Sequence, residues 1–166
     1  MDRRKLGIAF AFGAIVLLLV GAFTKKWWVE GGMSSGFLGA EFCGRSGHCE
    51  SISWLEAKDT FALFLGYGGY AALVGTLVLV ALLGYLGYAS AARPELPPRT
   101  GAKVTFIVAI LALLGGIGYA FGWNFAGAKK LTIGYSAYIY FAGAVVAIAA
   151  ARMLRHSGAT SQPPIA

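Results

Sequence analysis

Four apolar stretches dominate the chain and restrict it to a narrow class of folds. They cover residues 6–24, 60–89, 102–123 and 131–154. A hydrocarbon core about 30 Å thick is crossed by about 20 residues of helix, so each stretch is long enough to span it. A spanning segment must satisfy its own backbone hydrogen bonds in lipid, and a helix does so. The sequence therefore predicts an all-α membrane fold, a single four-helix transmembrane bundle over residues 1–166.

The composition agrees with this class. Hydrophobic residues make up 58% of the chain, and the mean hydropathy is +0.69, both above the usual values for a soluble domain of this size. The formal net charge of +7 could indicate nucleic-acid binding. However, basic residues beside helix ends ordinarily face lipid headgroups. We therefore expect membrane lipid, and no nucleic acid, as a partner.

The charged residues divide unequally between the two sides of the expected membrane. One side carries eight basic residues, which are Arg3, Arg4, Lys5, Arg93, Arg99, Lys103, Arg152 and Arg155. The acids on this side are Asp2 and Glu95. On the other side, six lysines and arginines are offset by five acids. An excess of lysine and arginine marks the cytoplasmic side. The pattern predicts a multi-pass protein of a plasma membrane or bacterial inner membrane, with both termini cytoplasmic.

Residues 25–59 form the longest polar segment, on the outer side. Residues 31–40 within it are rich in glycine, which predicts turns or short strands rather than helix. All four tryptophans fall on this side, namely Trp27, Trp28, Trp54 and Trp123. Tryptophan prefers the headgroup region of a membrane, so we expect these residues to be interfacial anchors.

The other connections are short. Residues 91–101 contain three prolines and predict a non-helical hinge on the inner side. Residues 124–130 connect the third and fourth helices so briefly that these two must be antiparallel neighbours. Residues 157–166 are polar and contain proline, which predicts a disordered cytoplasmic tail.

Small residues recur along the predicted helices. Lipid offers no hydrophobic drive for helices to associate, so close backbone approach at small residues must hold them together. The positions expected to serve this packing are Gly66, Gly69, Gly115, Gly118, Gly122, Gly143, Ala147 and Ala151. The alternative is that one such face pairs with a second copy of the chain.

Residues typical of catalysis are scarce. The interiors of the apolar stretches contain no Asp, Glu, Lys, Arg or His, which disfavours a proton-coupled transporter or an intramembrane hydrolase. Cys43 and Cys49 share the outer loop, where a structural disulfide is expected. A catalytic thiol relay is the rival interpretation. His48 lies between them, but structural zinc requires four ligands, so we expect no metal.

The outer loop resembles the claudin and peripheral-myelin-protein superfamily. The signature of that superfamily is a tryptophan, then Gly-Leu-Trp, then two cysteines ahead of the second helix. The matching residues here are Trp27 or Trp28, then Gly36, Phe37 and Leu38, then Cys43 and Cys49. Residues 102–123 and 134–152 are also similar to the third and fourth helices of the superfamily. Abundant alanine, glycine and leucine would suit a bacterial member.

The chain departs from the superfamily pattern in its outer loops. Leu38 replaces the last signature tryptophan, and four residues separate it from Cys43, where two are usual. The shorter first loop leaves little room for the full outer β-sheet of claudins, so only short strands are expected. The brief second loop removes much of the adhesive surface of claudins.

The resemblance implies a non-enzymatic membrane protein that acts in cell–cell or lateral contacts, or as an accessory subunit of a larger membrane complex. Phe37, Leu38 and Phe42 are the expected contact surface. Alternatively, these side chains pack against Trp27, Trp54 and the top of the bundle. Two other functions remain open: a small thiol/quinone oxidoreductase that uses the cysteine pair, and an oligomeric pore. No cofactor is expected.

Overall fold

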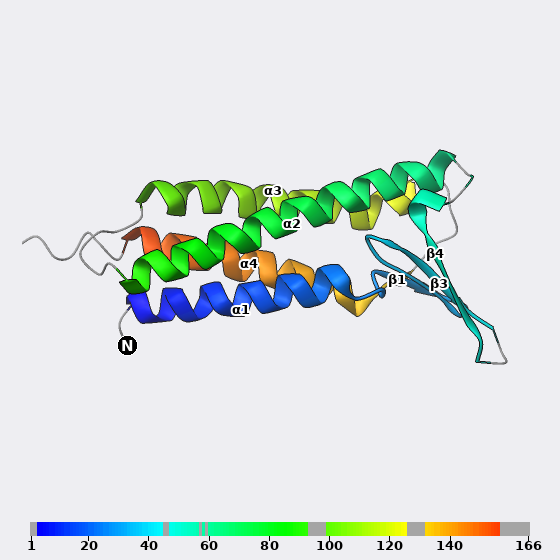
Figure 1. Ribbon diagram of the computed structural model, residues 1–166, viewed down its shortest axis with the longest axis horizontal. Helices are drawn as coiled ribbons and strands as arrows, with labels where there is room; N and C mark the ends of the chain where they lie inside the picture. Colours follow the sequence, from blue (N-terminus) through cyan, green and yellow to red (C-terminus); the bar gives the residue numbers. More distant parts are fainter. Residues whose placement is uncertain are drawn as a thin grey trace, which may run out of the picture.

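Four long helices carry a small β-sheet at one end. A computed structural model describes residues 3–44, 47–56, 58, 60–92, 99–125 and 132–156. The helices are α1 (Arg3–Phe23), α2 (Thr60–Ala92), α3 (Arg99–Phe125) and α4 (Tyr135–His156). They run alternately in opposite directions, so the start of α1 and the end of α4 lie together, away from the sheet (Figure 1). The four-helix prediction is confirmed, and all four helices are long and apolar enough to cross a membrane.

The helix bounds differ from the predicted stretches at the connections. The helical part of the chain resumes at Arg99, directly after two prolines, so the predicted hinge over residues 91–101 is shorter than expected. α4 begins at Tyr135 rather than at residue 131, because Thr132 and Ile133 form a strand. Residues 93–98 and the predicted disordered tail, 157–166, lie outside the described part.

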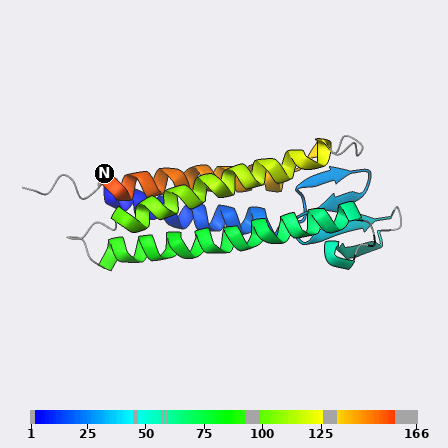
Figure 2. The ribbon, with the colours of Figure 1, turned by 90° about the horizontal axis from the view of Figure 1, so that it is seen from above.

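The helices pack in the cyclic order α1, α4, α3, α2 (Figure 2). The expected antiparallel neighbours α3 and α4 are in contact, and α1 and α4 form the closest pair. Small side chains make that pairing close, as membrane helix packing requires. The fully or nearly fully buried residues along it include Ala11, Ala14, Leu18, Ala137, Ala144, Ala147 and Ala151.

A five-stranded antiparallel sheet lies at the end of the bundle away from the start of α1. Its strands are β1 (Trp28–Glu30), β2 (Met33–Ser35), β3 (Gly39–Cys43), β4 (Cys49–Ser53) and β5 (Thr132–Ile133), in the spatial order β4-β3-β2-β1-β5. A single 3₁₀ turn, Trp54–Glu56, leads from β4 toward α2. The prediction of short strands is confirmed.

The expectation that the outer loop is too short for a full sheet is wrong, for two physical reasons. The β1–β2 turn consists of only Gly31 and Gly32, both with positive φ, the backbone form that a tight two-residue hairpin requires. In addition, the second outer connection supplies β5, which pairs with β1. The sheet therefore draws on two segments that are distant in the sequence.

Candidate functional site at the sheet end

Two adjacent tryptophans attach the sheet to the bundle. The indole N–H of Trp27 donates to the carbonyl oxygen of Gly21 in α1 at 2.7 Å. The indole N–H of Trp28 donates to the carbonyl oxygen of Ala120 in α3 at 3.1 Å. Both side chains are fully buried. The prediction that they are headgroup anchors is therefore wrong: they form the joint between the sheet and two helices.

Trp54 is also buried rather than interfacial. Its indole N–H donates to the carbonyl oxygen of Gly36 at 2.8 Å, and the same oxygen accepts the hydroxyl of Tyr119 at 3.2 Å. The β2–β3 turn is thus held from the loop side by Trp54 and from α3 by Tyr119. The side chain of the fourth tryptophan, Trp123, lies outside the described part.

Phe37 belongs to the core and not to the contact surface predicted for it. Its ring centroid lies 4.3 Å from that of Trp27 and 5.1 Å from that of Tyr119, and the side chain is fully buried. The alternative interpretation, packing against Trp27 and the bundle, is confirmed for this residue. Leu38 is half-buried, so of the three predicted contact residues only Phe42 is well exposed, at 44%.

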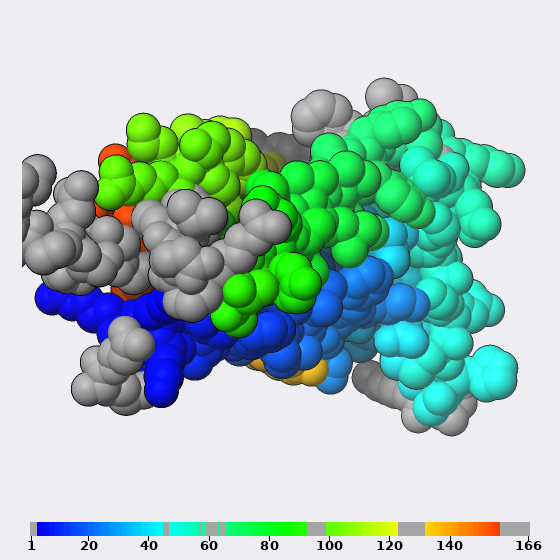
Figure 3. Space-filling view, turned by 60° about the vertical axis from the view of Figure 1, so that its left-hand side comes forward, coloured from blue at the N-terminus to red at the C-terminus, as the bar shows by residue number. Residues whose placement is uncertain are grey.

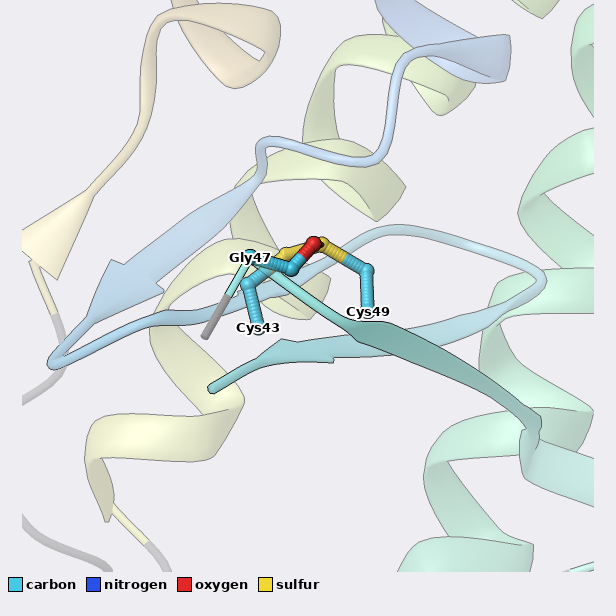
Figure 4. Close-up of a disulfide and its surroundings, with 3 residues drawn as sticks. All are labelled: Cys43, Gly47 and Cys49. Atoms are coloured by element: carbon cyan, nitrogen blue, oxygen red, sulfur yellow. Dashed lines mark hydrogen bonds between the residues drawn. A yellow bond between two sulfur atoms is a disulfide. The ribbon is translucent and has the colours of Figure 1, made fainter. Parts of the chain in front are cut away.

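The disulfide between Cys43 and Cys49 closes the outer hairpin of the sheet. The two residues are register partners at the ends of β3 and β4, with Cα atoms 4.0 Å apart. Figure 4 shows the bridge, with Gly47 of the hairpin turn beside it. The predicted disulfide is confirmed.

The register of the strands separates the sheet into two chemically different faces. Residues directly opposite on paired strands point to the same side, and so do residues two apart on one strand. One face carries the aligned row Thr132, Val29, Ser34, Glu41 and Ser51. The other face carries the aligned row Ile133, Trp28, Ser35, Ala40 and Ile52. Trp28, Ser35 and Ala40 are buried, so this second face is the one that rests on the bundle.

The bundle-facing side of the sheet continues beyond the bundle. Its next aligned row is Glu30, Met33, Phe42 and Glu50, which we call the overhang row. Phe42 is exposed, and Met33 opposite it is half-exposed. The acids Glu30 and Glu50 at the two ends of the row are also exposed. The strands project past the helices at the right-hand end of the space-filling view (Figure 3). Met33 and Phe42 therefore form an apolar pair, flanked by two acids, that stays partly exposed on the bundle-facing side of the sheet.

The small residues predicted for helix packing fall into two groups. Five do pack: Gly66 lies against Trp54, Gly69 against Phe37 and Tyr119, Gly143 against Leu18, and Ala147 and Ala151 are buried. Gly115, Gly118 and Gly122 do not, because a Cβ added at any of them would meet nothing within 4 Å. Packing within the chain is therefore contradicted for these three, and pairing with a second copy stays a prediction. Gly116 of α3 packs tightly instead, because its added Cβ would lie 2.7 Å from Cε1 of Tyr140.

Two further packing glycines, Gly7 and Gly21, were missed in the sequence. Gly21 lies against the backbone of Tyr140, and Gly7 lies against Leu154. Both are on α1 and both face α4. Their spacing of 14 residues is close to four helical turns, which is the signal that could have identified them.

A hydroxyl pair lies inside the bundle, and a small apolar groove opens on its surface. The hydroxyls of Thr76 and Tyr140 are 3.0 Å apart. Tyr140 also lines a groove of about 380 Å³ between α2 and α3, together with glycines and alanines of both helices. Among the described residues, no group of three or more His, Cys, Asp and Glu side chains could hold a metal ion.

Comparison of the sequence with protein-family models gives no match, and comparison with curated protein sequences gives none either.

Proposed function

We propose that this chain is a non-enzymatic, claudin-like membrane protein that acts through lateral contacts of its outer sheet, as an accessory subunit or with a copy of itself. The overhang row is the observation that carries this proposal. Its apolar pair, Met33 and Phe42, is left partly exposed on a sheet that buried tryptophans attach to the bundle. A surface held in place in this way suits recognition, because little order is lost when a partner binds.

The chemistry of the two sheet faces favours a lateral contact over a cell–cell contact. The face turned away from the bundle is polar apart from Val29 and the Cys43–Cys49 disulfide. The apolar pair lies on the opposite face, which points back toward the bundle and, with the helices placed across a membrane, toward the lipid surface. A partner beside the protein in the same membrane could reach it. Exposed apolar residues with charged flanks are typical of such interaction sites.

The membrane placement within this proposal follows from the helices and from the charges. The excess of lysine and arginine at the end away from the sheet would be cytoplasmic, and the disulfide-closed sheet would be outside. An oxidising outer compartment is consistent with the disulfide. The resemblance to claudins implies an outer sheet ahead of the second helix, and the sheet with its Cys43–Cys49 bridge is consistent with that implication.

The test is to extract the protein from its native membrane in mild detergent and to measure the mass and composition of the complex. Phe42→Ser is expected to release the protein as a monomer, because it removes the most exposed apolar side chain of the overhang row. Val29→Ser is the matched control, since Val29 is 40% exposed on the opposite face of the same sheet. A wild-type monomer, or a complex that survives Phe42→Ser, would contradict the proposal.

A further inference from the structure

We infer that the end of the bundle away from the sheet holds a binding site for a phosphate-bearing anion. A pocket of about 290 Å³ lies there and is lined by Arg99, Lys103, Arg155 and His156. No part of the contact function proposed above assigns a role to this pocket. The inference is independent of the overhang row, which lies at the other end of the molecule.

Two helix ends bring the four side chains together. Arg99 is the first residue of α3, and Lys103 follows four residues later, on the same side of that helix. Arg155 and His156 are the last two residues of α4, which packs against α3. The first turn of α3 also has backbone N–H groups without intrahelical partners, and these favour an anion.

The charge of this pocket is not balanced by any acid that the structure describes. The described acids are Glu30, Glu41, Glu50 and Glu56, and all four belong to the sheet or to the 3₁₀ turn beside it. The sequence places two further acids near this end, Asp2 and Glu95, and both lie outside the described residues. Arg99, Lys103 and Arg155 are exposed and therefore accessible to a ligand.

The chemistry of the side chains points to phosphate. The guanidinium of arginine donates two parallel hydrogen bonds to a phosphate group, and lysine adds a further positive charge. The pocket lies at the ends of two helices that are long enough to span a membrane, which would place it at headgroup level. Basic pockets between membrane helices on the cytoplasmic side bind anionic headgroups. A soluble phosphate would satisfy the same side chains, so the experiment must separate these two sources.

The first arm of the experiment measures lipid binding. The full chain is placed in nanodiscs of phosphatidylcholine with a minor share of phosphatidylglycerol, and co-purified lipid is counted by native mass spectrometry. Arg99→Gln with Arg155→Gln is expected to lower the affinity for phosphatidylglycerol about 25-fold, at about fivefold for each basic side chain. The matched control is Arg3→Gln with Lys5→Gln, which removes the same charge from exposed residues at the same end, outside the pocket.

The second arm titrates inorganic phosphate into the protein in neutral detergent and follows the unfolding temperature. A soluble anion would be identified as the ligand if phosphate raises the unfolding temperature of the wild type and of the Arg3→Gln, Lys5→Gln control. The Arg99→Gln, Arg155→Gln variant would then show no such rise. Loss of phosphatidylglycerol in the pocket variant alone would identify a lipid headgroup. The inference would be overturned if the pocket and control variants lost phosphatidylglycerol binding equally. It would also be overturned if the pocket variant changed neither lipid binding nor the effect of phosphate on the unfolding temperature. Helix content by circular dichroism shows that both variants are folded.

Discussion

A hydrogen bond from the indole positions each of three described tryptophans at the sheet end, Trp27, Trp28 and Trp54. The three buried indole N–H groups donate to carbonyl oxygens of Gly21, Ala120 and Gly36. A buried donor without a partner would cost about 1–3 kcal/mol, so these bonds fix where each ring can sit. Phe37 has no polar atom in its side chain and fills the space that the rings leave. The contrast between Phe37 and Phe42 therefore lies in burial and not in residue type.

Phe37→Ala should destabilise the protein strongly, by about 3–5 kcal/mol, because it removes a fully buried ring and leaves a cavity beside Trp27. Phe42→Ala is the control and should change the free energy of unfolding by less than about 1 kcal/mol, because its ring is partly in solvent. Chemical unfolding in detergent measures both variants. Similar losses for the two would contradict the burial difference on which the contact surface depends.

The pairing of α1 with α4 depends on glycines at particular turns of the helix. Gly21 allows the backbone of Tyr140 to approach so closely that an added Cβ would lie 2.7 Å from its amide nitrogen. Gly13, on the same helix, faces open space. The two positions thus differ in packing while sharing one helix and one residue type.

Gly21→Ala should reduce stability by about 1–3 kcal/mol, because the clash is with backbone and α1 must move away from α4. Gly13→Ala should be neutral or slightly stabilising, since alanine is the better helix former and nothing is near it. Thermal unfolding in a mild detergent would compare them. An unfolding temperature that falls equally in both variants would show that glycine flexibility, and not close approach, is what matters.

The disulfide acts on one element, the β3–β4 hairpin. Replacing Cys43 and Cys49 together by serine should lower the local stability of this hairpin by about 2 kcal/mol, the entropy of a short closed loop. Hydrogen exchange should accelerate in β3 and β4, while amides of α1 stay protected, because the bond from Trp27 to α1 does not involve the bridge. Unchanged exchange in the hairpin would argue against a structural role for the disulfide.

At the scale of the whole molecule, the two ends differ in chemistry. One end carries a sheet with an uncovered apolar pair and all the acids that the structure describes. The other carries a basic pocket at the ends of α3 and α4. This difference between the two ends makes the proposed orientation testable without any mutation.

Lys58 and Lys5 are exposed lysines at opposite ends of the molecule. In intact cells, a membrane-impermeant amine reagent should modify Lys58 and spare Lys5, because the sheet end is expected outside. Permeabilised cells should show modification of both lysines by mass spectrometry. Labelling of Lys5 alone in intact cells would reverse the orientation, and equal labelling would contradict a spanning bundle.

The sequence alone determined the parts of the structure that depend on local composition. Helical length and apolarity predicted the four helices, and two cysteines in one loop predicted the bridge. These features follow from chain neighbours, so no tertiary information was needed. Glycine-rich spacing also predicted short strands, because Gly31 and Gly32 favour a tight turn by themselves.

Only the tertiary structure decided the surroundings of each side chain. A tryptophan near a helix end can lie in headgroups or fill a joint, and composition does not distinguish these two environments. β5 forms because the short connection after α3 returns beside β1, a contact between residues more than 100 positions apart. The overhang row likewise depends on strand register, since a shift of one residue would turn Phe42 to the other face. Such choices depend on the packing of distant segments, which no local pattern records.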